Sequence, residues 1–180
     1  MTRMPTIAGR HPRNVDYYLE RTSHGSTCRR VVNAWVLARS DRRRSWRFFV
    51  EALASNLHDV QGGTTAEGIH LEAMAGTVDL VQRCYTGLET REDVLWVNPS
   101  LPGELDGLDF QVRYLGHWDI NLHLTRSRLR VQVPASGAAP VRVAVNGQLA
   151  ELDPGGSREF PLEVPEDGAR GPARPRPFGP

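Results

Sequence analysis

The sequence predicts an α+β protein, with a helical first half and an antiparallel β-sandwich in the second half. Apolar residues in the first half recur every three or four positions, as in amphipathic helices. From about Val94 they recur at every second position, which is typical of half-buried strands. The pair Asn146-Gly147 separates two apolar runs and is the strongest short signal for a β-hairpin.

The composition is that of a globular protein of one domain or two small ones. The 180 residues include 39% hydrophobic and 24% charged residues, which argues against a disordered chain. With 22 basic and 21 acidic residues the net charge is +1, so neither nucleic acid nor a membrane surface is expected as a partner. No apolar run approaches the roughly 18 residues that span a bilayer. Only Cys28 and Cys84 are present, which favours free thiols and a reducing, cytoplasmic location.

Three helices are expected. Each of the first two has an apolar face, composed of Val31, Val32, Trp35 and Ala38 in the first helix and Trp46, Phe49, Val50, Leu53 and Leu57 in the second. The segment 40–44 between them ends in three arginines; a solvated turn is the favoured interpretation and an anion-binding patch the alternative. The third helix follows segment 62–65, which begins with two glycines. Apolar residues, with small residues among them, lie around much of its circumference, which predicts burial on several sides.

Five strands are expected in the second half, over residues 108–115, 120–124, 129–133, 141–145 and 160–164. Alternation along them predicts an inward-facing set, composed of Phe110, Val112, Ile120, Leu122, Val131 and Val143. The polar neighbours Asp109, Gln111 and Arg113 are predicted to face solvent. The histidines of this half, His117 and His123, are interpreted as packed or surface residues.

Two polar, glycine-bearing junctions each precede an expected helix, and both are candidate anion sites. A helix N-terminus presents unpaired backbone N–H groups and the positive end of the helix dipole. Hydroxyl and imidazole donors accompany them, from His24, Ser26, Thr27, Thr64, Thr65 and His70. The alternative is that the hydroxyls are helix caps and the glycines make turns. No cluster of His, Cys, Asp and Glu predicts a metal site.

At these junctions the sequence resembles glycoside hydrolase family 65. Segment 14–27 reads NVDYYLERTSHGST, segment 61–70 reads QGGTTAEGIH and segment 74–83 continues with MAGTVDLVQR. Further on, segments 93–102 (DVLWVNPSLP) and 114–118 (YLGHW) are similar to the passage into the C-terminal β domain of that family. The resemblance covers roughly residues 12 to 133, and its motifs occur in the expected order.

The resemblance implies a fold in two parts. Residues 1–95 are expected to be the last helices of an (α/α)6 catalytic barrel, residues 96–165 a small β-sandwich, and residues 166–180 a disordered tail. The general-acid Glu and the sugar-binding Lys-Gln pair of the family lie upstream of the matching region. We therefore expect this chain to be the C-terminal part of a longer or split enzyme, with no catalytic acid of its own.

The family also implies a chemistry. Its members cleave α-glucosidic bonds of trehalose, maltose or kojibiose with inversion, without metal or organic cofactor. Carried over by motif, His24, Ser26, Thr27 and His70, with Thr64 and Thr65 nearby, are similar to the phosphate-holding elements of the phosphorylases. No acid lies between His24 and Thr27, which favours phosphorolysis over hydrolysis because a carboxylate repels phosphate.

Two positions depart from the family pattern. Cys28-Arg29 stands where Leu-Ser is usual, and Glu72 stands where Gly or Ala is usual. The expected partners are a disaccharide, inorganic phosphate and the upstream remainder of the enzyme, with a homodimer left open. A hydrolase of the same family, or an inactive fragment kept as a binding module, are the alternatives. Without the remainder we expect uncovered apolar faces that include Trp35, Phe49 and Met74.

Overall fold

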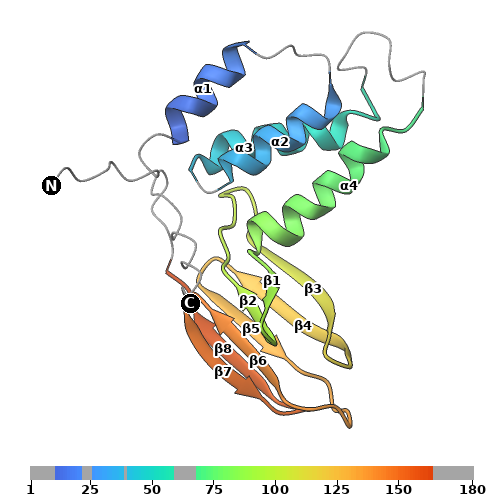
Figure 1. Cartoon of the computed structure of the whole chain (residues 1–180), viewed down its shortest axis with the longest axis vertical. Helices are drawn as coiled ribbons and strands as arrows, with labels where there is room; N and C mark the ends of the chain where they lie inside the picture. Colours follow the sequence, from blue (N-terminus) through green and yellow to red (C-terminus); the bar gives the residue numbers. More distant parts are fainter. Residues whose placement is uncertain (1–10, 22–25, 39, 59–67, 164–180) are drawn as a thin grey trace, which may run out of the picture. The chain divides into compact units, whose positions relative to one another are not determined.

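The computed structural model describes residues 11–21, 26–38, 40–58 and 68–163. It divides into two compact units, one up to Leu80 and one from Val81 onward. The first unit is helical and the second contains every strand of the described residues (Figure 1). The predicted change from helices to strands is therefore confirmed. Within the described part of the chain, no helix combines the length and the apolar content needed to cross a membrane.

The helical unit is built from α1 (His11–Arg21), α2 (Thr27–Leu37), α3 (Arg42–Ala54) and α4 (Leu71–Asp79). Helix α4 continues into η3, a π-helical segment (Leu80–Tyr85). Helix α1 was not among the three helices expected from the sequence, and its residues are mostly polar. Helices α2 and α4 approach closely at Gly76, where an added Cβ would lie 2.5 Å from Val31 Cγ1. A glycine is therefore what lets the two helices meet at this distance.

The buried faces of α2 and α3 differ from the predicted apolar faces. Helix α3 buries Ser45, Phe49 and Ala52, whereas Val50 and Leu53 are 45% and 44% exposed. The Ser45 hydroxyl donates to the Ala34 carbonyl at 2.7 Å, which satisfies a polar group inside the helix pair. Ser45 and Ala52 are small enough to permit close helix packing, whereas Val50 and Leu53 are turned outward.

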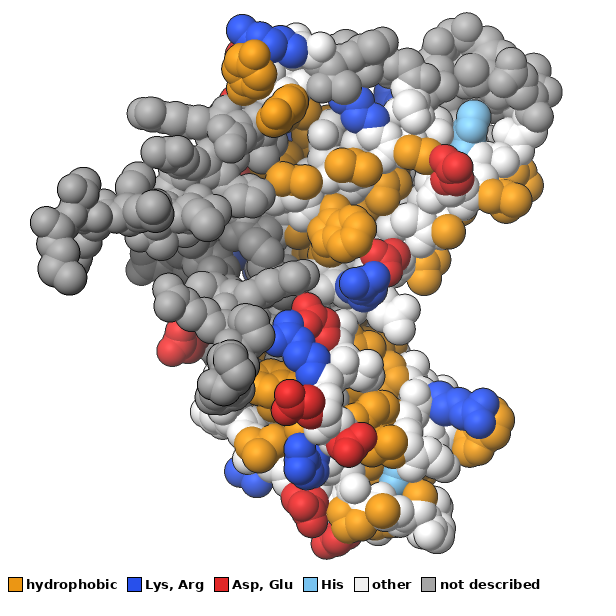
Figure 2. Space-filling model, viewed as in Figure 1, with side chains coloured by type: hydrophobic (Ala, Val, Ile, Leu, Met, Phe, Trp, Pro, Cys, Tyr) orange, Lys and Arg blue, Asp and Glu red, His pale blue; other side chains and the backbone are white. Residues whose placement is uncertain are grey.

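Of the three residues expected on uncovered faces, the structure supports Trp35 and contradicts Phe49. Trp35 is 41% exposed, Met74 is half-buried and Phe49 is only 6% exposed. Phe49 lies on the same helical face as Ser45 and stacks on Trp46 with ring centroids 5.1 Å apart. Figure 2 shows hydrophobic side chains, coloured orange, at the surface of the helical unit. The other exposed hydrophobic side chains of this unit include Val32, Val36, Val50, Leu53, Leu57, Ile69, Leu71 and Val78.

The strands form two four-stranded sheets. One has the order β1-β2-β6-β7, from β1 (Glu89–Arg91), β2 (Val94–Val97), β6 (Val141–Val145) and β7 (Gln148–Leu152). The other has the order β3-β4-β5-β8, from β3 (Gly107–Tyr114), β4 (His117–Thr125), β5 (Arg128–Gln132) and β8 (Ser157–Pro161). The inner faces of both sheets contribute to one hydrophobic core, so the pair is a sandwich.

The predicted inward-facing residues occupy that core. Val112, Ile120, Leu122, Val131 and Val143 are at most 9% exposed, and Phe110 is partly buried against them. Their polar neighbours Asp109, Gln111 and Arg113 are exposed, as the alternation predicts. Asn146 and Gly147 both have positive φ, 47° and 86°, between β6 and β7. These angles are those of the hairpin turn that the dipeptide predicts.

The expectation of purely antiparallel strands is wrong at one place. Strands β2 and β6 pair in parallel, with Leu95 opposite Val143. The chain between them contains β3, β4 and β5 of the other sheet, which is a crossover long enough for parallel pairing. Strands β1, β2 and β7 were absent from the predicted set of strands. Strand β1 begins at Glu89, inside the range 1–95 that was expected to be helical. The expected domain limits stay predictions, and the expected tail 166–180 lies outside the described residues.

Candidate functional site

The two candidate junctions lie at the starts of α2 and α4. Thr27 is the first residue of α2 and Ser26 its N-cap, and His70 is the N-cap of α4. His24, Thr64 and Thr65, the other predicted site residues, lie outside the described residues. The predicted approach of His24 to His70 therefore stays a prediction.

The start of α2 contacts the start of α4 directly. The Cys28 thiol donates a hydrogen bond to Glu72 Oε2, with 2.7 Å between sulfur and oxygen. Cys28 is in the first turn of α2 and Glu72 in the first turn of α4, so the N-terminal ends of both helices lie together. Two helix N-termini with their unpaired N–H groups form a region of positive potential.

Side-chain donors at these ends are not used for capping. Neither Ser26 nor His70 makes a side-chain cap hydrogen bond. Ser26 is exposed and Thr27 is buried, with 6% of its surface accessible. The cap interpretation of Ser26 is therefore not supported by its geometry.

His70 is held by its backbone. Its N–H donates to Asn56 Oδ1 at 2.9 Å, which ties the start of α4 to the segment after α3. The ring atom Nε2 is buried and has no hydrogen-bond partner in the described structure. Asn56 is a positioning residue that sequence reasoning missed, because a polar residue after a helix carries no distinguishing signal. An unpaired buried nitrogen is costly unless a ligand or water supplies the partner.

Glu72 also controls the protonation of Cys28. The pKa of the Cys28 thiol is raised because the thiol donates to the Glu72 carboxylate, because burial disfavours the thiolate, and because the Glu72 charge repels it. The Ser26 and Thr27 side chains act in the opposite direction, through hydrogen bonds that lower the pKa. Cys28 is consequently a protonated donor beside a carboxylate.

Replacing Glu72 by Gln is expected to make Cys28 more reactive. The substitution removes the negative charge that raises the pKa of Cys28, so the thiolate fraction at a fixed pH near 8 increases. We expect iodoacetamide to alkylate Cys28 several-fold faster in the Glu72→Gln variant, with the two rates converging at high pH. Cys84, which forms no disulfide and is 5% exposed, is the internal control and should stay unreactive. Equal Cys28 rates across the pH range would contradict the assignment.

The remaining histidines of the sandwich behave as expected. His117 is 1% exposed and bonds through Nε2 to the Ala139 carbonyl at 2.9 Å and through Nδ1 to Ser136 Oγ at 3.1 Å. His123 lies on the surface and pairs with Asp109. Among the described residues, no group of three His, Cys, Asp or Glu side chains is arranged to hold a metal ion.

Comparison with known proteins identifies the family. Residues 7–79 match the glycosyl hydrolase family 65 central catalytic domain, and residues 88–152 match the C-terminal domain of the same family. The chain belongs to glycosyl hydrolase family 65. The resemblance of the junction motifs is thereby confirmed, and the two matched regions follow each other in the order that the motifs predicted.

Three curated family 65 relatives illustrate the similarity. An uncharacterized glycosyl hydrolase of Mycobacterium tuberculosis is 46% identical over 78% of this chain and 11% of its own length. Trehalose 6-phosphate phosphorylase of Lactococcus lactis is 39% identical over 57% of the chain and 14% of its length. Kojibiose phosphorylase of Caldanaerobacter subterraneus is 31% identical over 77% of the chain and 18% of its length.

The fold comparison agrees with the sequence comparison. A solved structure from the human microbiome, described as a candidate kojibiose phosphorylase, superposes with a TM-score of 0.67 at 18% identity. The match covers 85% of this family 65 chain and 20% of the solved chain. At this identity the likeness concerns the fold. The chain thus spans a fifth or less of each of these relatives.

Proposed function

We propose that this chain is the C-terminal part of an inverting family 65 phosphorylase, which cleaves an α-glucosidic bond of trehalose, maltose or kojibiose type with inorganic phosphate. In this proposal α1–α4 are the last helices of the (α/α)6 barrel. The observation that carries it is the meeting of two helix N-termini beside the buried, unpartnered Nε2 of His70. The names of similar proteins, which include trehalose and kojibiose phosphorylases, support the same class.

The proposed residues have separate roles around one phosphate ion. Ser26, Thr27, His24, Thr64 and Thr65 donate hydrogen bonds together with the backbone N–H groups of the helix ends. His70 donates from its ring or, when protonated, also contributes positive charge. Phosphate attacks the anomeric carbon from the face opposite the leaving sugar, so the C–O glycosidic bond breaks as a C–O–P bond forms with inverted configuration. The leaving oxygen takes its proton from the general acid, which the family places upstream.

One observation favours the hydrolase alternative. Glu72 places a carboxylate at the joined helix ends, where it competes with an incoming phosphate by like-charge repulsion. In an inverting hydrolase a carboxylate activates the attacking water instead. The two functions therefore differ in how Glu72 affects phosphate binding.

Phosphate titration followed at the His70 ring tests the proposal. We expect saturable shifts of the His70 imidazole resonances in NMR spectra of the full chain at fixed pH. The Glu72→Gln variant is expected to bind phosphate several-fold more tightly, because a repelling charge is removed. The exposed ring of His123 is the matched control.

Three results would count against the phosphorylase. The His70 resonances could stay unmoved by phosphate, which would exclude His70 from an anion site. Equal shifts of His123 would mean unspecific binding. Phosphate binding that appears in Glu72→Gln but not in the unsubstituted chain would show that the carboxylate excludes phosphate, and would favour the hydrolase.

A further inference from the structure

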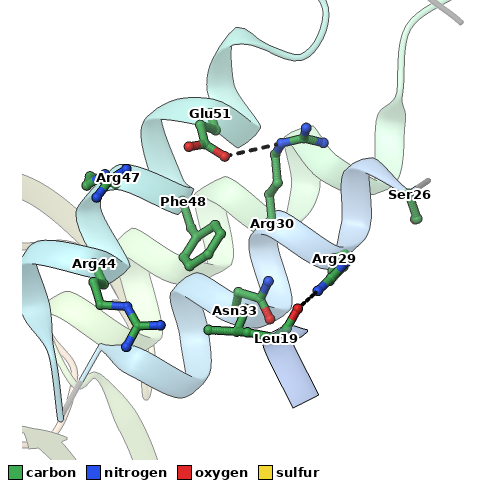
Figure 3. A pocket seen from close by; sticks show the side chains of 9 residues that line it. All are labelled: Leu19, Ser26, Arg29, Arg30, Asn33, Arg44, Arg47, Phe48 and Glu51. Atoms are coloured by element: carbon green, nitrogen blue, oxygen red, sulfur yellow. Dashed lines mark hydrogen bonds and ion pairs between the residues drawn. The ribbon is translucent and has the colours of Figure 1, made fainter. Parts of the chain in front are cut away.

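The helical unit contains a cavity that the proposed catalytic site does not explain. It lies between α2 and α3, with Leu19 of α1 also in its wall, and has a volume of about 350 Å³ (Figure 3). Neither His70 nor Glu72 lines it, and Ser26 is the lining residue that it shares with the proposed phosphate site. Its nine lining residues are Leu19, Ser26, Arg29, Arg30, Asn33, Arg44, Arg47, Phe48 and Glu51.

Positive charge dominates this lining. Four arginines line the cavity, against the one carboxylate of Glu51. Arg29 and Arg30 come from the first turn of α2, whereas Arg44 and Arg47 are three residues apart on α3 and so share a face of that helix. Like charges grouped around a small volume repel one another, so an anion in the cavity would stabilise the arrangement.

The ion pairs already present at the cavity are weak ones. Arg30 Nε lies 3.4 Å from Glu51 Oε2, and Arg44 lies 2.7 Å from Asp16 Oδ1. Arg44 Nε also lies 3.9 Å from Asp41 Oδ2. The carboxylates of these three pairs are partly exposed, and such pairs contribute little because water and salt screen them. A ligand with higher charge density can therefore displace them.

Arg29 and Arg47 are the other two arginines of the lining. Arg29 donates one N–H to the Leu19 carbonyl at 2.8 Å, which anchors its guanidinium against α1. A guanidinium carries five N–H donors and binds phosphate oxygens two at a time. Arg47 is exposed and makes no ion pair with any other described residue.

Neutral groups complete the cavity. Phe48 stands between the labelled arginines of the two helices in Figure 3, and with Leu19 it provides an apolar wall. Asn33 adds an amide on the α2 side. The volume lies at the lower end of the range for small-molecule sites, roughly 300–1,000 Å³. A partly open cavity of this size suits a small charged molecule.

From charge, size and lining we infer that this cavity binds a phosphate group, either as the free ion or as the monoester of a small molecule such as a sugar. The phosphate contacts Arg29 and Arg47, and the carbon skeleton of an ester lies against Phe48. The site is separate from the phosphate position proposed at His70. It needs no catalytic step and does not depend on the proposed function.

Ligand binding to arginine variants of the full chain tests this inference. The probes are glucose 6-phosphate, inorganic phosphate and glucose, measured calorimetrically at constant ionic strength. Arg47→Gln is expected to weaken glucose 6-phosphate binding roughly tenfold, as expected for one charge-assisted contact. Arg43→Gln is the matched control, because Arg43 is exposed on the same helix and does not line the cavity. Tighter binding of glucose 6-phosphate than of inorganic phosphate would assign the site to an ester, and the reverse order to the free ion.

A residue-specific readout separates this cavity from the His70 site. Phenylglyoxal modifies arginine side chains, and the 22 basic residues of this chain are all arginine. We expect the phosphate probes to slow modification of Arg29 and Arg47, but not of Arg43, in both the wild-type chain and a His70→Asn variant. Equal protection of Arg43, equal weakening by Arg43→Gln and Arg47→Gln, or binding of glucose as tight as that of its phosphate would overturn the inference.

Discussion

A polypeptide limited to residues 1–180 is expected to form no detectable sugar phosphate from trehalose, maltose or kojibiose and inorganic phosphate. In the proposed function the general acid lies outside this polypeptide, and general-acid catalysis is typically worth about 10²- to 10⁴-fold in rate. In the proposed (α/α)6 barrel, walls formed by other helices also align the sugar with phosphate, and such alignment can lower the barrier by roughly 7–11 kcal/mol. Glu20, Glu67 and Glu72 are carboxylates near the junction motifs, and none matches the family's acid motif.

The measurement is chromatographic detection of glucose 1-phosphate after long incubation. The control adds a separate polypeptide that carries the preceding part of a family 65 catalytic domain, with light scattering to follow association. Val32, Val50 and Leu57 are 53%, 45% and 78% exposed, so the chain alone should self-associate and the added polypeptide should cover these side chains. Robust turnover by the chain alone would overturn this prediction.

The second large effect is expected in the sandwich core. Leu122 is 1% exposed on β4, opposite Phe110 and Val131 of the neighbouring strands. Leu122→Ala is expected to lower the free energy of unfolding by about 2–5 kcal/mol, because it removes buried methyl groups and leaves a cavity. Leu149→Ala on β7 is the matched control, since Leu149 is 60% exposed and its truncation should cost less than about 0.5 kcal/mol.

Hydrogen exchange of the full chain measures this effect inside the sandwich. The backbone amides of β4 and β5 report on the core, independently of the helical unit. We expect their protection to fall strongly in Leu122→Ala and hardly at all in Leu149→Ala. Comparable losses in the two variants would mean that the alternating residues do not separate an inner from an outer face.

The phosphate candidates illustrate how far sequence reasoning reached at the site. Motifs nominated Ser26, Thr27 and His70, and the structure brings the two helix starts that carry them together. The motifs gave no indication of the Cys28–Glu72 hydrogen bond, which joins residues 44 positions apart. The arginines of segment 40–44 left an anion-binding patch as an alternative, but nothing in the sequence joined Arg44 and Arg47 to the arginines of α2. Contacts between helices depend on loop paths and packing, which a local pattern does not contain.

The sequence by itself determined the inner faces of the central sandwich strands and the turn at Asn146-Gly147. Strand alternation has a period of two, so burying one residue such as Ile120 forces the burial of its alternate neighbours. The tertiary structure alone decided which faces of the helices are buried and that β2 pairs with β6 in parallel. A helix with apolar residues on several sides can pack in more than one orientation, and close approach through Ser45, Ala52 and Gly76 selects among them. Pairing between distant strands likewise follows from the crossover through the second sheet, since each strand has the same alternation whichever neighbour it takes.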